Sequence, residues 1–304
     1  MPPPQGTWNP LEGPGDYTTT KTVHSDSYPA IDPTKANLSG KAVFVSGGSR
    51  GLGRSMALSY ARAGASQIAV GARSNLSKVA SDCKTAAKEA GKQEPEVLCL
   101  VMDITDQSSV ERACRRIGEE FGKLDVVINN AGVIGDMVSI GDSTLDSWWQ
   151  TYNVNVRGPY LVMRGCLPLL LKGELKTVAT VASVGALVVM PTLSDYQSSK
   201  LAALRITEFF AKENAEQGII AFSIHPGNIL TDIVGMGEGM DDALKAVFTE
   251  SPELAGDSLV YLTKERRPWI SGRYLNVTWD LPELESRREE IVDGDLLKVR
   301  LALP

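Results

Sequence analysis

A tyrosine and a lysine four residues apart, Tyr196 and Lys200, carry the chemistry that this sequence suggests first. On a helix, residues at this spacing lie on one face, so the ammonium group would lie close to the phenol. A free tyrosine has a pKa near ~10, and a nearby cation favours the phenolate, which suits the phenol to proton transfer. Helices without a catalytic role also carry such pairs, so the pair alone does not decide the function.

A serine and a glycine-rich loop strengthen the catalytic interpretation. Ser183 follows a β-branched run, 176–182, that has the composition of a strand, and it precedes Tyr196 by 13 residues. A serine at a strand end can also be a simple cap. Near the other end of the chain, the loop 47–53 lies directly between a short apolar run, 42–46, and an Ala-rich helical run. Its glycines would let the backbone turn sharply and approach a pyrophosphate at the helix N-terminus.

These features resemble the short-chain dehydrogenase/reductase family, whose catalytic serine precedes a Tyr-x-x-x-Lys by about this interval. The loop is similar to the family's T-G-x-x-x-G-x-G, with Ser46 in place of the threonine and its hydroxyl retained. The resemblance covers residues 38–280, with the motifs in the family's order. It implies an α/β fold in a single domain, a Rossmann-type doubly wound parallel sheet with helices on both faces.

The resemblance adds an asparagine to the catalytic residues. Asn155 stands inside a helix expected over 146–171 and is followed by Arg157-Gly158, as in the family. An asparagine in a helix is mildly unfavourable and needs a reason. In the family the reason is a local distortion that holds a water in a proton relay to the lysine. The implied catalytic residues are Asn155, Ser183, Tyr196 and Lys200.

The end of the second expected strand, 67–71, indicates which nicotinamide cofactor binds. A free ribose 2′-hydroxyl is usually held by an acidic residue at this strand end, and here the chain reads Ala72-Arg73-Ser74 instead. Arg50 and Arg73 would flank the adenosine ribose, and paired arginines suit a phosphate dianion. Either arginine could be merely solvated, but the missing carboxylate also favours NADP(H).

Three later segments supply the other cofactor contacts that the resemblance implies. Asp103, after the expected strand 96–102, matches an aspartate that binds the adenine amino group, although it could equally cap the next helix. Residues 129–132 read Asn-Asn-Ala-Gly, as in the family, and 226–231 match the P-G-x-x-x-T segment that covers the nicotinamide. The implied cofactor site comprises Ser46, Gly47, Ser49, Arg50, Gly51, Leu52, Gly53, Arg73, Ser74, Asp103, Ile104, Asn130, Ala131, Gly132, Tyr196, Lys200, Pro226, Gly227, Ile229 and Thr231.

Composition excludes several classes of partner. The formal net charge is −6 and no dense Lys/Arg block occurs, which argues against a nucleic-acid surface. No apolar run is long enough to span a membrane. The four cysteines lack C-x-x-C spacing and there are only two histidines, so no metal site is expected. We interpret the cysteines as buried thiols in the reducing cytoplasm, and His225, just before Pro226, as structural.

The two ends of the chain lie outside the expected catalytic domain, 38–280. Residues 1–37 are rich in Pro, Gly, Thr and Ser and are expected to be a flexible leader, although Trp8, Tyr17 and Tyr28 could strap it onto the body or a partner subunit. Residues 231–250, inside the expected domain, combine glycines with apolar side chains, which suits a substrate lid.

The C-terminal extension, residues 281–304, could dock on the body of the protein or on a neighbouring subunit. A homodimer or homotetramer is expected.

The sequence therefore predicts an NADP(H)-dependent oxidoreductase that interconverts a carbonyl and a secondary alcohol, with reduction of a ketone favoured. Tyr196 would protonate the developing alkoxide, and Ser183 would hydrogen-bond the same oxygen. The leader and the Trp279-Asp280 ending resemble fungal members, which suggests a role in secondary metabolism. Two alternatives stay open, a non-redox rearrangement or cyclisation and a nucleotide-sensing protein without turnover.

Overall fold

The computed structural model describes residues 3 and 5–301 and forms one parallel sheet of seven strands in the order β3-β2-β1-β4-β5-β6-β7. The strands are β1 Ala42–Ser46, β2 Gln67–Ala72, β3 Glu96–Val101, β4 Val126–Asn129, β5 Thr177–Val181, β6 Ile220–His225 and β7 Tyr274–Asn276. The order reverses between β1 and β4, so the sheet is doubly wound, as the sequence predicted.

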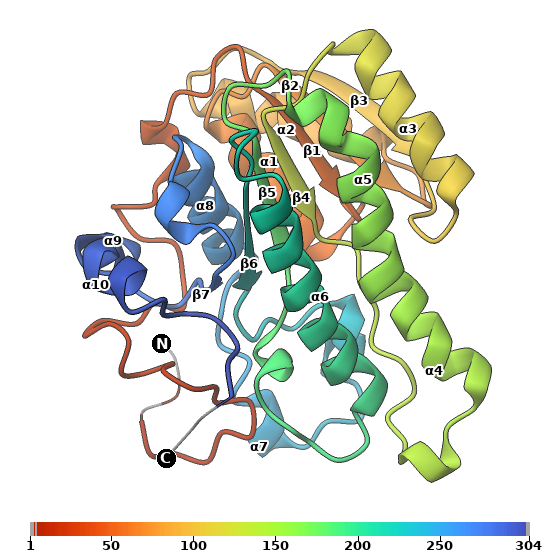
Figure 1. Ribbon diagram of the computed structural model, residues 1–304, viewed down its shortest axis with the longest axis vertical. Coiled ribbons are helices and arrows are strands. Elements are labelled where there is room, and N and C mark those ends of the chain that lie inside the picture. Colours follow the sequence, from red (N-terminus) through yellow and green to blue (C-terminus); the bar gives the residue numbers. More distant parts are fainter. Residues whose placement is uncertain (1–2, 4, 302–304) are drawn as a thin grey trace.

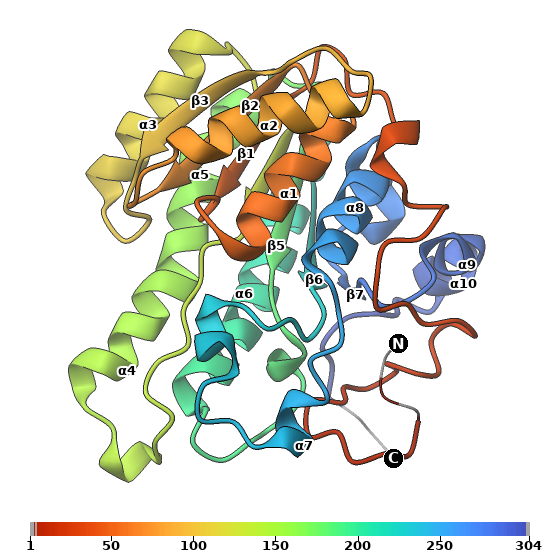
Figure 2. The ribbon, with the colours of Figure 1, turned by 180° about the vertical axis from the view of Figure 1, so that it is seen from behind.

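Helices cover both faces of the sheet, which confirms the predicted Rossmann-type architecture (Figures 1 and 2). The α-helices are α1 Gly51–Arg62, α2 Ser77–Glu89, α3 Gln107–Glu120, α4 Leu145–Tyr152, α5 Gly158–Leu170, α6 Ser194–Glu213, α7 Asp242–Lys245, α8 Pro252–Thr263, α9 Leu281–Ser286 and α10 Arg288–Asp293. Helices α3, α5 and α6 lie on the face seen in Figure 1, and α1, α2 and α8 on the face seen in Figure 2. None of these described helices is long and apolar enough to cross a membrane.

The central strands are buried on both faces. All five residues of β1 and all six of β6 are buried, as parallel strands between two helical layers must be. One hydrophobic core fills the side of α1, α2 and α8, and a second fills the side of α3 and α5. The two cores hold the carboxyl ends of the strands at one rigid edge, where the loops can place functional groups.

The leader differs from the flexible segment that the sequence predicted, because its described part packs on the body. Ile31 is 1% exposed, and the backbone of Val23 pairs with that of Trp279. Trp279 also donates from Nε1 to the carbonyl oxygen of Gly15 at 3.1 Å, and the Tyr28 hydroxyl accepts from the amide of Leu281 at 2.9 Å. The aromatic strap considered from the sequence is therefore seen for Tyr28, whereas Trp8 is exposed.

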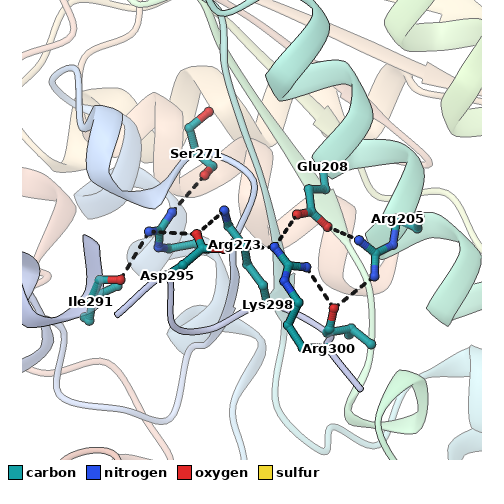
Figure 3. A network of polar contacts seen from close by, with 9 residues as sticks. Arg205, Glu208, Ser271, Arg273, Ile291, Asp295, Lys298 and Arg300 are labelled. Carbon is teal, nitrogen blue, oxygen red and sulfur yellow. Dashed lines mark hydrogen bonds and ion pairs between the residues drawn. The ribbon is translucent and has the colours of Figure 1, made fainter. Parts of the chain in front are cut away.

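The C-terminal extension docks through ion pairs on the helix that carries Tyr196 and Lys200. Arg300 donates to Glu208 of α6 at 2.9 Å and to Asp295 within the extension at 3.1 Å. Figure 3 shows this network of polar contacts. Arg205, also on α6, donates to the backbone oxygen of Val299 at 2.9 Å. Most of these side chains are partly exposed, so each pair contributes little to stability by itself. Together they fix where the extension lies.

Candidate functional site

An open cleft of about 1090 Å³ lies at the carboxyl ends of the strands and brings the predicted site residues together. Every residue proposed for the cofactor lines this cleft except Ser46, which lies just behind the glycine loop. Ser183 also lines it, whereas Asn155 is buried beside it. In doubly wound sheets ligands bind at this edge, next to the point where the strand order reverses.

The glycine loop is built for close approach of backbone to backbone. Gly47 has a φ of +70°, and a Cβ there would lie 2.7 Å from the Cα of Ala131. A Cβ on Gly53 would lie 2.3 Å from the carbonyl oxygen of Gly47. Neither contact leaves room for a side chain. Both positions therefore require glycine, and the tight turn leads directly into the N-terminus of α1, a helix end that favours a pyrophosphate group.

The hydroxyl group of Ser46, directly before this loop, connects strand β1 to the segment after strand β4. Its Oγ accepts a hydrogen bond of 3.1 Å from the amide of Asn130. The Asn130 side chain adds two hydrogen bonds in the opposite direction: its Nδ2 donates to the carbonyl oxygens of Ser46 and Gly47, both at 3.0 Å. The ends of β1 and β4 are thus tied together, which places Ala131 and Gly132 on the floor of the cleft.

The two arginines proposed for the 2′-phosphate have different surroundings. Arg73 is exposed and, within the described part of the chain, makes no hydrogen bond or ion pair. Arg50 lies across the cleft mouth, with Nε 3.3 Å from Oδ2 of Asp232. Burial disfavours the charged form of Asp103, but hydrogen bonds from Thr105 and the nearby charge of Arg73 lower its pKa overall. Arg73 and Asp103 therefore lie close together at the end of the cleft proposed for adenosine.

Asn155 lies where the long helix expected over 146–171 changes its hydrogen-bond pattern. A π-helical turn, Asn153–Arg157, separates α4 from α5. Asn155 Oδ1 accepts from the amide of Val133 at 2.9 Å, and its Nδ2 donates to the Val133 oxygen at 2.8 Å and to Ser199 Oγ at 3.0 Å. π-turns inside helices are frequent at functional sites. Here the turn lets one side chain join the segment after β4 to α6.

Tyr196 and Lys200 share one face of α6, as their spacing predicted. The Lys200 ammonium lies 5.7 Å from the centre of the Tyr196 ring and donates to the carbonyl oxygen of Val181 at 2.9 Å. Burial lowers the pKa of Lys200 from 10.5 to about 8. Burial also raises the pKa of Tyr196, against a hydrogen bond with Ser183 that acts in the lowering direction. The net effect on the Tyr196 pKa is therefore an increase, and the expected lowering by the lysine is not seen.

His225 supports the backbone instead of facing a reacting atom. Its ring Nδ1 accepts a hydrogen bond of 3.1 Å from the amide of Val184, the residue after Ser183. Burial lowers the pKa of His225 to about 3, so the imidazole is neutral at ordinary pH. This placement agrees with the structural interpretation. The segment that follows begins with Pro226 and Gly227 and lines the cleft with Ile229 and Thr231.

Sequence reasoning did not single out three residues that line the cleft or lie buried beside it. Leu11 of the leader lines the cleft, although nothing in its local sequence indicates this. Asp195 is buried beside Tyr196 and accepts a hydrogen bond of 2.6 Å from Thr151; an acid in the first turn of a helix was the available signal. Glu250 is also buried and accepts from the amide of Asn228 at 2.6 Å. In the described part of the chain no cluster of three or more metal-ligating side chains occurs.

Comparison with known proteins identifies relatives of this chain. The family model of short chain dehydrogenases matches residues 41–239. The short chain dehydrogenase pigC of Monascus ruber is 53% identical over 99% of both chains. The short chain dehydrogenase tazN of Aspergillus terreus is 52% identical over 96% of this chain, which spans 63% of the length of that relative.

Solved structures agree with the fold. A dehydrogenase/reductase from Sinorhizobium meliloti 1021 superposes with a TM-score of 0.67 at 26% identity and covers 80% of this chain and 96% of its own. Levodione reductase gives a TM-score of 0.69 at 25% identity, over 80% of this chain and 97% of its own. With the family match and the extent of identity to its relatives, the chain belongs to the short-chain dehydrogenase family of oxidoreductases.

Proposed function

We propose that this protein is an NADPH-dependent reductase that converts a ketone into a secondary alcohol. The observation that carries the proposal is the placement of Tyr196, which lines the cleft with Ser183 and whose ring centre lies 5.7 Å from the Lys200 ammonium on the same helix. Desolvation raises the pKa of this phenol, so it is protonated at neutral pH. A protonated phenol is ready to donate a proton, as reduction of a carbonyl requires. The reverse reaction would need the phenolate.

The cofactor would be held by the glycine loop, by the segments 130–132 and 226–231, and by the two arginines. Gly47 and Gly53 let the loop pack tightly against Ala131 and on itself, because neither position has room for a side chain. Arg73 has no partner within the described residues, so its guanidinium is free for the 2′-phosphate of NADPH. When bound, NADPH supplies the hydride, and the protein supplies position and protons.

The chain's own residues would act on the substrate oxygen and on the cofactor ribose. Ser183 would hydrogen-bond the carbonyl oxygen, and Tyr196 would transfer its proton to the oxygen as negative charge develops there. Lys200 would hold the ribose and stabilise the phenolate that is left behind. Asn155 would keep the relay path in place from its π-turn, because its side chain is fixed by Val133 and Ser199.

The substrate class follows from the walls of the cleft near Tyr196. They consist largely of uncharged side chains, including Ile134, Met190, Leu193, Val234 and Met240. We propose an apolar, uncharged ketone as substrate, and a role in fungal secondary metabolism, which the fungal relatives support.

We also propose that the protein forms a homo-oligomer and that it acts in the cytoplasm. Exposed Tyr160 of α5 and Phe209 of α6 could join two copies of the chain in a homo-oligomer. All four cysteines are free, which suits the cytoplasm.

The decisive experiment follows the near-ultraviolet absorbance of NADPH while a panel of apolar ketones is added to the protein. Consumption of NADPH that depends on both ketone and protein supports reduction. Conversion of a substrate without any change in NADPH would favour the non-redox alternative, and cofactor binding without conversion would favour a nucleotide sensor.

A further inference from the structure

The leader reaches the catalytic end of the cleft through a turn that the body of the protein holds in place. This leader turn, residues 11–16, closes when Asp16 Oδ2 accepts from the amide of Gly13 at 2.7 Å. Asp16 Oδ1 accepts from Asn276 Nδ2, at the end of β7, at 2.9 Å. Trp279 Nε1 binds the carbonyl oxygen of Gly15 at 3.1 Å. Two residues of the body therefore fix the turn.

The anchored leader turn packs directly against the loop that begins with Ser183. A Cβ on Gly13 would lie 2.3 Å from Cγ2 of Val184, so the leader backbone packs against this side chain without space between them. The amide of Val184 is itself held by His225. The leader turn thus lies against a part of the catalytic centre that is fixed from the other side.

Leu11, at the start of the turn, is half-buried and faces the cleft. It lines the same cleft as Ser183 and Val184, and Gly13, two residues later, packs against the Val184 side chain. Arg50 and Arg73 line the adenosine end instead. The side chain of Leu11 is therefore available to a substrate group that extends past the reacting carbon.

We propose that the leader turn is one wall of the substrate site and that Leu11 is a specificity-determining residue that selects ketones with an extended apolar substituent. The inference rests on the proposed function, because it takes Ser183 and Tyr196 as the groups that bind the carbonyl. A short ketone would not reach Leu11, whereas a longer alkyl chain would bury methylene groups against it. Each buried methylene strengthens binding about three- to fourfold.

Calorimetric titration of the full-length protein with 2-butanone and with 2-octanone tests this inference without turnover. Each titration is made with the protein saturated with NADP⁺, which has no hydride to transfer, and again without nucleotide. We expect Leu11→Ala to weaken the binding of 2-octanone roughly fivefold or more and to change 2-butanone binding less than twofold. Leu11→Asn, which keeps the size but not the apolar surface, should have the same effect.

The matched control is Trp8→Ala, which removes an exposed apolar side chain of the leader that does not line the cleft. It should leave both affinities unchanged, and the melting temperature of each variant shows whether the leader is still docked. Equal weakening of both ketones in the Leu11 variants, or no detectable binding of 2-octanone to the wild type, would overturn the inference. NADPH oxidation with the same ketones tests the proposed function separately.

Discussion

Nδ1 of His225 accepts a hydrogen bond of 3.1 Å from the amide of Val184, so the last residue of β6 fixes the loop that begins with Ser183. Both groups are buried, and an amide left there without an acceptor would be costly. The position of Ser183, the serine of the proposed mechanism, therefore depends on the hydrogen bond that this histidine accepts.

Replacing His225 tests this dependence. His225→Ala should lower the free energy of unfolding by about 2–4 kcal/mol, from the unsatisfied amide and the cavity left behind. His225→Asn, whose Oδ1 can accept from the same amide, should retain more of the stability. Urea denaturation measures both variants, and equal losses would show that the hydrogen bond does not matter.

Lys200 should set the upper limit of the pH range of reduction. Its pKa is lowered to about 8 by burial, so its positive charge is present below pH 8 and is lost above it. In the proposed mechanism this charge stabilises the phenolate that proton donation leaves behind, so kcat/KM for NADPH should be flat near neutral pH and fall above about pH 8. Lys200→Arg keeps the positive charge at high pH. The kcat/KM of this variant should therefore not fall above about pH 8, even if its absolute value is lower than that of the wild type. A wild-type rate that increases between pH 8 and 10 would contradict this role.

The arginines should decide between the two nicotinamide cofactors. A charge-assisted hydrogen bond contributes about 1.5–3 kcal/mol, so Arg73→Ala should weaken NADPH roughly ten- to a hundredfold and leave NADH nearly unchanged. Arg50→Ala should have a smaller effect, because Arg50 already pairs with Asp232. Arg112→Ala on α3, whose side chain is exposed near Asp106, serves as the control. Equal weakening of NADPH and NADH would assign Arg73 to the shared adenosine or to the fold.

Removing residues 1–37 should destabilise the protein, in contrast to the behaviour of a flexible leader. The deletion takes away Ile31 and uncovers Trp279, each 1% exposed in the intact chain. Burial of a large apolar side chain contributes about 1.5–3 kcal/mol, so the melting temperature should fall by about 10 °C or more. Deletion of residues 1–8 alone, which leaves the anchors from Gly13 onward, is the control. A melting temperature unchanged by the longer deletion would show that the leader does not stabilise the body.

The sheet and the motifs of the cleft were predictable because their signals are local. The apolar runs of β1 and β6 mark buried strands, and the glycines at 47 and 53 follow β1 directly. The order of the leader was not predictable, because its partners are far away in the sequence. Asp16 and Asn276 are 260 residues apart, and nothing near Asp16 indicates this contact. The raised pKa of Tyr196 was missed for a related reason, since it depends on burial by the folded chain.

Tyr196→Phe tests the central claim most directly, because the variant keeps the ring and loses only the hydroxyl. The measurement is NADPH oxidation with an apolar ketone that the wild type reduces, alongside NADPH binding followed by its fluorescence. The account predicts loss of at least a thousandfold in kcat, with the NADPH dissociation constant changed less than about threefold. Turnover within tenfold of the wild type would contradict the role of Tyr196 as proton donor, and with it the proposed mechanism.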